Sequence, residues 1–120
     1  SSRIYSSQDI ERWHINEMKS LLSRFSGVKF IFDNVKQKYY PVLRDAITSF
    51  RSKNEGKPLV VIDDTPFIDF DILDYPVNDI EEIFLLKGSD AAIWGPKASN
   101  GIIVIITQRG KSTKIEQKEE

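Results

Sequence analysis

Two apolar runs decide the fold: Pro58-Leu59-Val60-Val61-Ile62 and Ile102-Ile103-Val104-Ile105-Ile106. Both are rich in β-branched residues, which favour strands, and turn-forming residues bound them. Asp63-Asp64-Thr65-Pro66 follows the first run, and Asn100-Gly101 precedes the second. We therefore expect two buried strands, with residues 102–107 lying beside 58–62 or 82–86 in one mixed sheet.

Weaker strand patterns lie on either side of the first run. Residues 28–32 alternate in the manner of a strand, and residues 40–44 form a second candidate. Pro41 donates no backbone hydrogen bond, so this second strand is expected at a sheet edge or at a strand start. Residues 83–86 are apolar and predict a further strand, in which Ile83 and Leu85 share one core face with Ile103 and Ile105.

Short helices are expected between the strands. Ser6-Ser7-Gln8-Asp9 is typical of a helix start, and Asn16 is a candidate cap for a second short helix that Gly27 ends. Residues 78–79 and 89–94 predict helical turns, the latter ended by Gly95. Strands and short helices that alternate irregularly indicate an α+β fold, a small domain with one mixed β-sheet and short helices.

Composition excludes several classes of function. The chain has 120 residues, 40% of them hydrophobic and 29% charged, which suits one soluble domain. A formal net charge of -1 argues against nucleic acid as the main partner, because phosphate binding needs a basic face. The longest apolar run has five residues (102–106), far short of the about 20 that a membrane-spanning helix needs.

Side chains that carry enzyme chemistry are scarce. The chain has no cysteine and one histidine, His14, which we expect to be structural, so neither zinc nor thiolate chemistry is predicted. Residues 69–80 depart from a calcium loop at the positions that require Gly and Glu. Asp63 and Asp64 would point to opposite sides of an extended chain and would form no carboxylate pair. We predict no enzyme, no catalytic residue, no metal and no cofactor.

Charge is unevenly distributed. Residues 58–86 hold eight acidic residues and no basic one, whereas residues 1–57 carry an excess of five positive charges. Apolar residues interleave with the acidic ones between 66 and 75, which indicates a protruding contact loop for a basic partner. Its candidate residues are Phe67, Asp69, Phe70, Asp71 and Asp74. The alternative is a solvated acidic loop whose apolar side chains pack on the domain's own core.

Ordered motifs cover about half of the chain. They are Pro58 to Asp63, Asn78-Asp79-Ile80-Glu81-Glu82-Ile83, Ala91-Ala92-Ile93-Trp94-Gly95, Ala98 to Ile103 and Ile106 to Gly110. In this order they resemble the plug domain of TonB-dependent outer-membrane receptors, and within it the SusC/RagA-like nutrient transporters of Bacteroidetes. Ser7-Gln8-Asp9-Ile10 and Leu43-Arg44 resemble earlier plug elements more loosely.

Within the resemblance, Arg44, Asp63, Gly95, Asn100 and Gly101 are the motif residues, with structural roles expected for the fold. The sequence departs from the family pattern at four positions, where it has Asp64, Asp45, Gly88 and Trp94. Asp64 and Asp45 replace family glycines, after residue 63 and after Arg44 respectively.

The resemblance implies a division into a plug-like domain at 1–110 and a polar charged tail at 111–120. It implies a transporter plug that occludes a barrel, gates substrate uptake and moves when TonB pulls. The implied partners are the β-barrel of the same or a parent protein, TonB and a surface lipoprotein, and the net charge predicts no nucleic-acid partner. The implied location is the cell envelope, at the outer membrane or its periplasmic side. The alternative, favoured by the tail, is a plug-like interaction module at the C-terminus of a barrel-less envelope protein.

Overall fold

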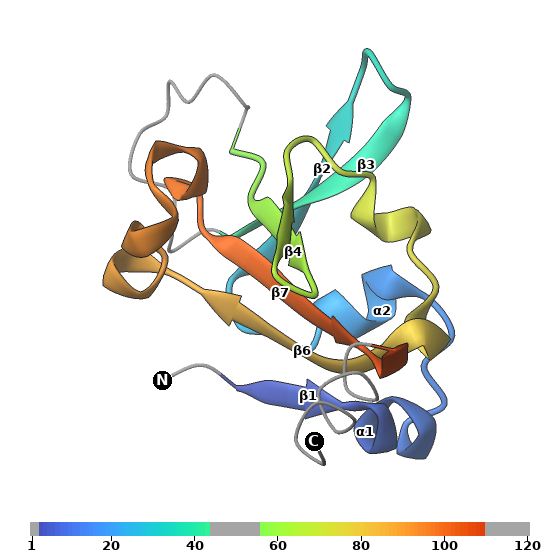
Figure 1. Ribbon diagram of the computed structural model, residues 1–120. Helices are drawn as coiled ribbons and strands as arrows, with labels where there is room; N and C mark the ends of the chain where they lie inside the picture. Colours follow the sequence, from blue (N-terminus) through green and yellow to red (C-terminus); the bar gives the residue numbers. More distant parts are fainter. Residues whose placement is uncertain (1–2, 44–55, 110–120) are drawn as a thin grey trace, which may run out of the picture.

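A computed structural model of the chain describes residues 3–43 and 56–109 (Figure 1). In these residues seven strands form two sheets, one of five strands in the order β1-β6-β7-β4-β5 and one of two strands, β2-β3. The larger sheet consists of β1 (Ile4–Ser6), β6 (Ile80–Leu86), β7 (Ile102–Thr107), β4 (Leu59–Ile62) and β5 (Thr65–Phe67). The hairpin consists of β2 (Val28–Asp33) and β3 (Lys38–Leu43). The larger sheet is mixed, because β4 and β7 are parallel and the other pairs are antiparallel.

Strand β7 is the centre of the larger sheet. It pairs with β4 on one side, where Leu59 lies opposite Ile102, and with β6 on the other, where Leu86 lies opposite Ile102. Ile102, Ile103 and Ile105 have no exposed surface. The predicted buried strand at 102–107 is therefore confirmed, and it lies beside both of the neighbours that the sequence offered as alternatives.

Both faces of this sheet are covered, which explains why its central strands are apolar at nearly every position. Val60, Ile83, Leu85, Ile103 and Ile105 belong to the main core, so the predicted core face is confirmed. On the opposite face, alternate residues of the same strands pack in a second cluster, which consists of Leu59, Val61, Ala91, Ala98 and Ile102.

Two short α-helices contribute to the main core. Helix α1 (Ser7–Arg12) begins at a capping box, in which the Ser6 hydroxyl accepts from the Asp9 amide and the Asp9 carboxylate accepts from the Ser6 amide. Helix α2 (Met18–Leu22) begins after Glu17, so the expected cap at Asn16 is wrong. Glu17 is still extended and makes no side-chain cap bond, and burial of Met18, Leu21 and Leu22 determines where this helix forms.

The described residues also contain 3-10 helices in the connections between strands. They are η2 (Ile72–Asp74), η3 (Val77–Asp79), η4 (Gly88–Asp90), η5 (Ala92–Trp94) and η6 (Pro96–Ala98). The turns predicted at 78–79 and 89–94 are thus present. Within the described residues no helix has the length and apolarity to cross a membrane.

Two features depart from the sequence-based expectation. Strands β1 and β5 were not predicted, because each has only three residues. Asp63 and Asp64 both have positive φ, 47° and 70°, so the turn predicted after the first apolar run is confirmed, but the extended backbone assumed for these two carboxylates is wrong. The two residues instead form the tight turn between β4 and β5, for which positive φ at both central positions is the favoured geometry. Arg44 and the tail at 111–120 lie outside the described residues.

Candidate functional site

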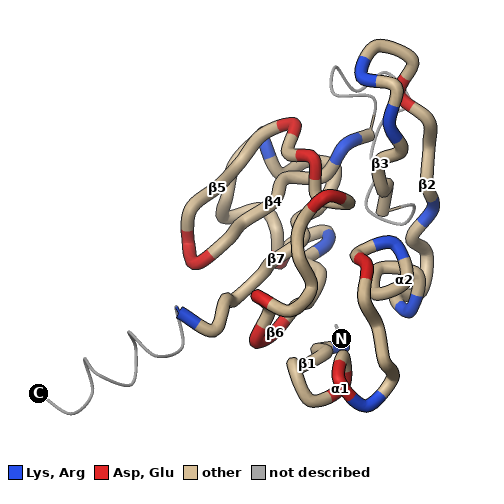
Figure 2. Tube along the Cα trace, turned by 90° about the vertical axis from the view of Figure 1, so that its right-hand side faces the viewer, with Lys and Arg blue, Asp and Glu red and all other residues tan. Residues whose placement is uncertain are grey.

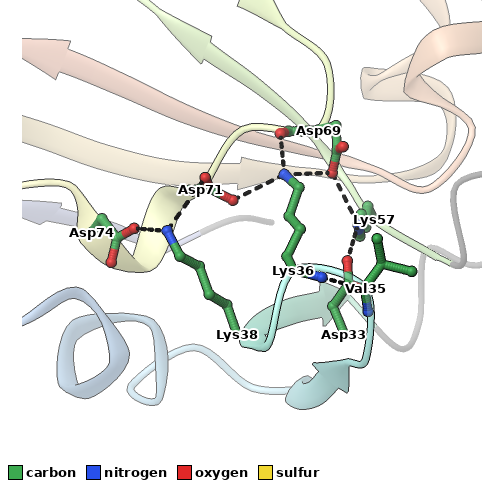
Figure 3. Close-up of polar contacts among 8 residues, drawn as sticks. All are labelled: Asp33, Val35, Lys36, Lys38, Lys57, Asp69, Asp71 and Asp74. Atoms are coloured by element: carbon green, nitrogen blue, oxygen red, sulfur yellow. Dashed lines mark hydrogen bonds and ion pairs between the residues drawn. The ribbon is translucent and has the colours of Figure 1, made fainter.

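The tip of the β2-β3 hairpin is organised by Asp33. One oxygen of its carboxylate accepts from the amides of Val35 and Lys36, at 2.9 and 3.2 Å. This arrangement is typical of an aspartate that stabilises a turn through its own backbone. Gln37, at the far end of the turn, has a φ of 57°. The turn directs the side chain of Lys36 toward the segment that connects β5 to β6 (Figure 3).

The second carboxylate oxygen of Asp33 binds Lys57, which lies just before β4. The distance from Lys57 Nζ to Asp33 Oδ2 is 2.7 Å, and the side chains of Lys57 and Asp33 are 16% and 8% exposed. The hydrogen bond from Lys57 is the largest cause that lowers the pKa of Asp33 to about 2. Burial lowers the pKa of Lys57, but its hydrogen bonds to Asp33 and Asp69 outweigh burial and leave that pKa raised. This pair joins the hairpin to the larger sheet.

Three aspartates of the β5-β6 connection meet these lysines. Lys57 lies 2.9 Å from Asp69, and Lys36 lies 3.1 Å from Asp69 and 3.0 Å from Asp71. We call the whole set the Lys–Asp cluster. It consists of Asp33, Lys36, Lys38, Lys57, Asp69, Asp71 and Asp74.

Lys38 extends the cluster along the hairpin. Its Nζ lies 2.7 Å from Asp74 and 3.5 Å from Asp71. In Figure 2 acidic positions lie on the side of the body that faces the hairpin, and the ion pairs identify Asp69, Asp71 and Asp74 as those that meet its lysines or Lys57. Hydrogen bonds from Lys57 and Lys36 lower the pKa of Asp69 and of Asp71, respectively. The hydrogen bond to Asp71 raises the pKa of Lys36, and the hydrogen bond to Asp74 raises the pKa of Lys38.

The apolar residues of the predicted contact loop divide into two groups. Ile72 is buried and Phe70 is half-buried against the main core, with its ring centroid 6.1 Å from that of Tyr75. Phe67 and Ile68 are 37% and 62% exposed, although Phe67 also contacts Phe70. The loop therefore exposes both apolar side chains and carboxylates, and the carboxylates of Asp69, Asp71 and Asp74 are already paired with lysines of the same chain.

The space beneath the Lys–Asp cluster is small. A cavity of about 20 Å³ lies between the lysines, Tyr40 and Phe70. That volume accommodates a single water molecule, so it is too small for a ligand. Among the described residues there is also no group of three or more His, Cys, Asp or Glu side chains that could hold a metal ion.

The motif residues have structural positions. Asp63 accepts a hydrogen bond from the Thr107 amide at 2.9 Å and another from the Thr107 hydroxyl, which ties the β4-β5 turn to the end of β7. Asn100 is buried and donates to the carbonyl of Lys57 at 3.3 Å. Gly95 and Gly101 have φ values of 81° and 89°, which glycine adopts without strain.

The basic half of the Lys–Asp cluster was not among the predicted site residues. A signal for it was present in the sequence, where the excess of positive charge in residues 1–57 complements the acidic segment at 58–86. The predicted partner of the acidic segment is another molecule. The structure shows that at least part of that partner is the chain's own hairpin.

Comparison with known proteins identifies relatives of this fold. A family model described as the TonB-dependent Receptor Plug Domain matches residues 1–102. The siderophore receptor PirA from Acinetobacter baumannii is 20% identical with a TM-score of 0.68, over 89% of this chain and 17% of that chain. The enterobactin-bound R480A mutant of the ferric enterobactin receptor PfeA from Pseudomonas aeruginosa is 19% identical with a TM-score of 0.67, over 89% of this chain and 17% of that chain.

A third receptor, FpvA from P. aeruginosa in complex with a ferric pyoverdine, is 13% identical with a TM-score of 0.59, over 90% of this chain and 14% of that chain. At these identities the likeness shows the fold alone. The chain corresponds to less than one fifth of the length of each of these receptors.

Proposed function

Because this chain belongs to the TonB-dependent receptor plug domains, we propose that it occludes the barrel of an outer-membrane nutrient transporter and gates substrate uptake. The single observation that carries the proposal is the family match over residues 1–102. The fold is consistent with it, because a sheet covered on both faces gives a rigid body that can block a channel. In this role the partners are the barrel of the same or a parent protein and TonB, and the location is the outer membrane.

The proposal is tested on the parent protein with and without residues 1–110. Both forms are reconstituted in planar lipid bilayers, and single-channel conductance is measured. We expect the intact protein to be nearly closed and the deletion to conduct through the open barrel, whose lumen is polar. Two closed forms would contradict the proposal. A parent gene product with no barrel segment would favour the interaction module of an envelope protein instead.

The finer assignment concerns the transported nutrient. We propose a SusC/RagA-like transporter that works with a surface lipoprotein, and the motifs from Pro58 to Asp63, 78–83 and 91–110 support it. The siderophore receptors share the fold, so uptake of a ferric siderophore is the competing assignment. Co-purification of a surface lipoprotein with the parent protein supports the first assignment, and parent-dependent growth on a ferric siderophore supports the second.

The contact loop at 66–75 remains part of the proposal. We propose that it faces the barrel wall, with Phe67 and Ile68 as the direct contacts because both are exposed. Asp69 and Asp71 act through the hairpin, whose lysines they hold in place. Binding of the chain to the separately supplied remainder of the parent should weaken with added salt and with Asp69→Lys plus Asp71→Lys. Phe67→Ser measures the apolar contact separately, and binding indifferent to all of these changes would contradict a role for the loop.

A further inference from the structure

A second cavity, of about 610 Å³, lies where the start of β1, the turn after α2 and the end of β6 meet. In Figure 1 this is the region near the labelled N-terminus, where the first strand runs beside the end of β6. Its volume falls in the range of about 300 to 1,000 Å³ that is typical of small-molecule sites. Neither the Lys–Asp cluster nor the motif residues contribute to its lining.

One side of this cavity is apolar, and its lining residues are fixed by contacts with one another. Tyr5, Phe25 and Leu85 are each at least 93% buried and line it. The Tyr5 hydroxyl donates to the carbonyl oxygen of Arg24 at 2.8 Å, and the rings of Tyr5 and Phe25 lie 4.6 Å apart. These contacts join β1 to the turn after α2, so the cavity is part of the packed structure.

The polar side of the cavity is basic. Arg3, Arg24 and Lys87 line it together with one carboxylate, that of Asp90, which gives a formal charge of +2. The guanidinium of Arg24 lies 3.7 Å from the centroid of the Trp13 ring, an arrangement that restrains an arginine without consuming its N–H donors.

Two of these cations differ from the lysines of the Lys–Asp cluster. Lys36, Lys38 and Lys57 each bind at least one aspartate. In the part of the chain that the structure describes, no carboxylate forms an ion pair with Arg3 or Arg24. Two guanidinium groups beside an apolar floor form a site that suits the planar, bidentate binding of a carboxylate or a phosphate group.

We propose that this cavity binds a small organic anion, whose acid group pairs with Arg3 and Arg24 and whose apolar part rests on Phe25 and Leu85. The acid group is a carboxylate or a phosphate, since both match the guanidinium in geometry. The concave shape and the apolar floor favour a small molecule over an extended acidic surface. This site goes beyond the proposed plug function and does not depend on it.

The experiment is a titration of the 120-residue chain, followed through backbone amide shifts by NMR. The probes are benzoate, phenyl phosphate and the uncharged benzyl alcohol. We expect saturable shifts at 3–5, 24–26 and 85–90 with at least one of the two anions, and weaker binding of benzyl alcohol by about tenfold or more. The anion that binds more tightly identifies the acid group.

Three variants test the charges. Arg24→Gln should weaken binding of the better anion about tenfold, and Asp90→Asn should tighten it, because it removes the one carboxylate of the lining. Arg12→Gln is the matched control, since Arg12 also lies over the Trp13 ring but is paired with Asp9 and does not line the cavity. The Arg12→Gln variant should bind the anion with the same affinity as the unsubstituted 120-residue chain.

Several outcomes would overturn the site. They are equal affinity for benzyl alcohol and the anions, shifts that do not saturate, equal effects of Arg24→Gln and Arg12→Gln, and weaker binding by Asp90→Asn. Arg3→Gln guards against the outcome that the Arg24 variant misfolds, because Arg3 is exposed, whereas Arg24 packs over the Trp13 ring. A folded Arg3→Gln variant that binds like the parent would also contradict the proposal.

Discussion

The central strands β4, β7 and β6 and the β2-β3 hairpin are held in place by different forces. The central strands pack on both faces through residues such as Ile103 and Ile105, which have no exposed surface. The tip of the hairpin carries Val35, which is 91% exposed, and is attached to the body by ion pairs of Lys36 and Lys38. Apolar burial responds little to ionic strength, whereas exposed ion pairs are screened by salt.

The base of the hairpin is held by apolar packing, as the larger sheet is. Leu43 is fully buried in the main core and Val42 is 3% exposed, so this end is held by apolar packing. Added salt should therefore loosen the tip of the hairpin and leave its base packed against the core. The comparison of sheet and hairpin tip can be tested in four ways, from the largest expected effect to the smallest.

The largest effect is expected for Ile105→Ala in β7. The substitution leaves a cavity in the main core and should lower the free energy of unfolding by about 2–5 kcal/mol, as measured by urea denaturation. Ile106→Ala is the matched control, because Ile106 is adjacent and only half-buried. A loss for Ile105→Ala no larger than that of its neighbour would show that the core does not depend on this face.

The next effect is expected for Gly95→Val, between η5 and η6. Gly95 has φ 81° and ψ -168°, a region that is essentially restricted to glycine. A Cβ placed there meets no atom within 4 Å, so the expected loss of about 1–3 kcal/mol comes from the backbone alone. Gly95→Ala should therefore lose a similar amount in the same urea experiment. If Gly95→Ala kept the stability of the unsubstituted chain and Gly95→Val lost it, the loss would come from crowding of the valine side chain instead.

Asp33→Asn tests the buried ion pair that joins hairpin and sheet. The pKa of Asp33 is lowered from 3.8 to about 2 in the folded chain, so its ionised form is favoured by folding. This contribution is fully present above about pH 4 and is lost as the pH falls toward 2. The urea midpoints of parent and variant should differ at pH 7 and converge near pH 2. Asp64→Asn, in an exposed turn, is the control, and a difference independent of pH would contradict the ion pair.

The smallest effect is expected for Lys38→Gln at the exposed end of the cluster. Global stability should hardly change, because exposed ion pairs contribute little. Amide hydrogen exchange at 33–38 should accelerate, and 1 M salt should have the same effect on the parent chain. Lys29→Gln, exposed on β2, is the control. Faster exchange throughout β7 would mean that the tip and the sheet unfold together.

Much of the sheet was predictable because its signals are local. β-branched runs mark β4 and β7, the Ser6 and Asp9 spacing marks the start of α1, and Gly95 marks the end of η5. Strands β1 and β5 have no such signal, since three residues carry too little periodicity. The positive φ values of Asp63 and Asp64 were also not predictable, because neither residue of this turn is a glycine.

The candidate site was only half predictable. The charge imbalance indicated that the acidic segment needs a basic partner, but it does not say which lysines provide one. Lys36 and Asp71 are 35 residues apart, and Lys38 and Asp74 are 36 apart. Ion pairs over such separations depend on how the hairpin is placed on the sheet, and residue order alone does not define that placement.

By itself the sequence determined the α+β class, the central strands, the turn residues and the family resemblance, because all of these depend on neighbours along the chain. The tertiary structure decided that the hairpin forms a second sheet and that its lysines neutralise the acidic loop. It also decided that Arg3, Arg24 and Lys87 share one cavity. The physical reason is that charge and cavity shape are properties of positions in space, and folding brings together residues that no local pattern connects.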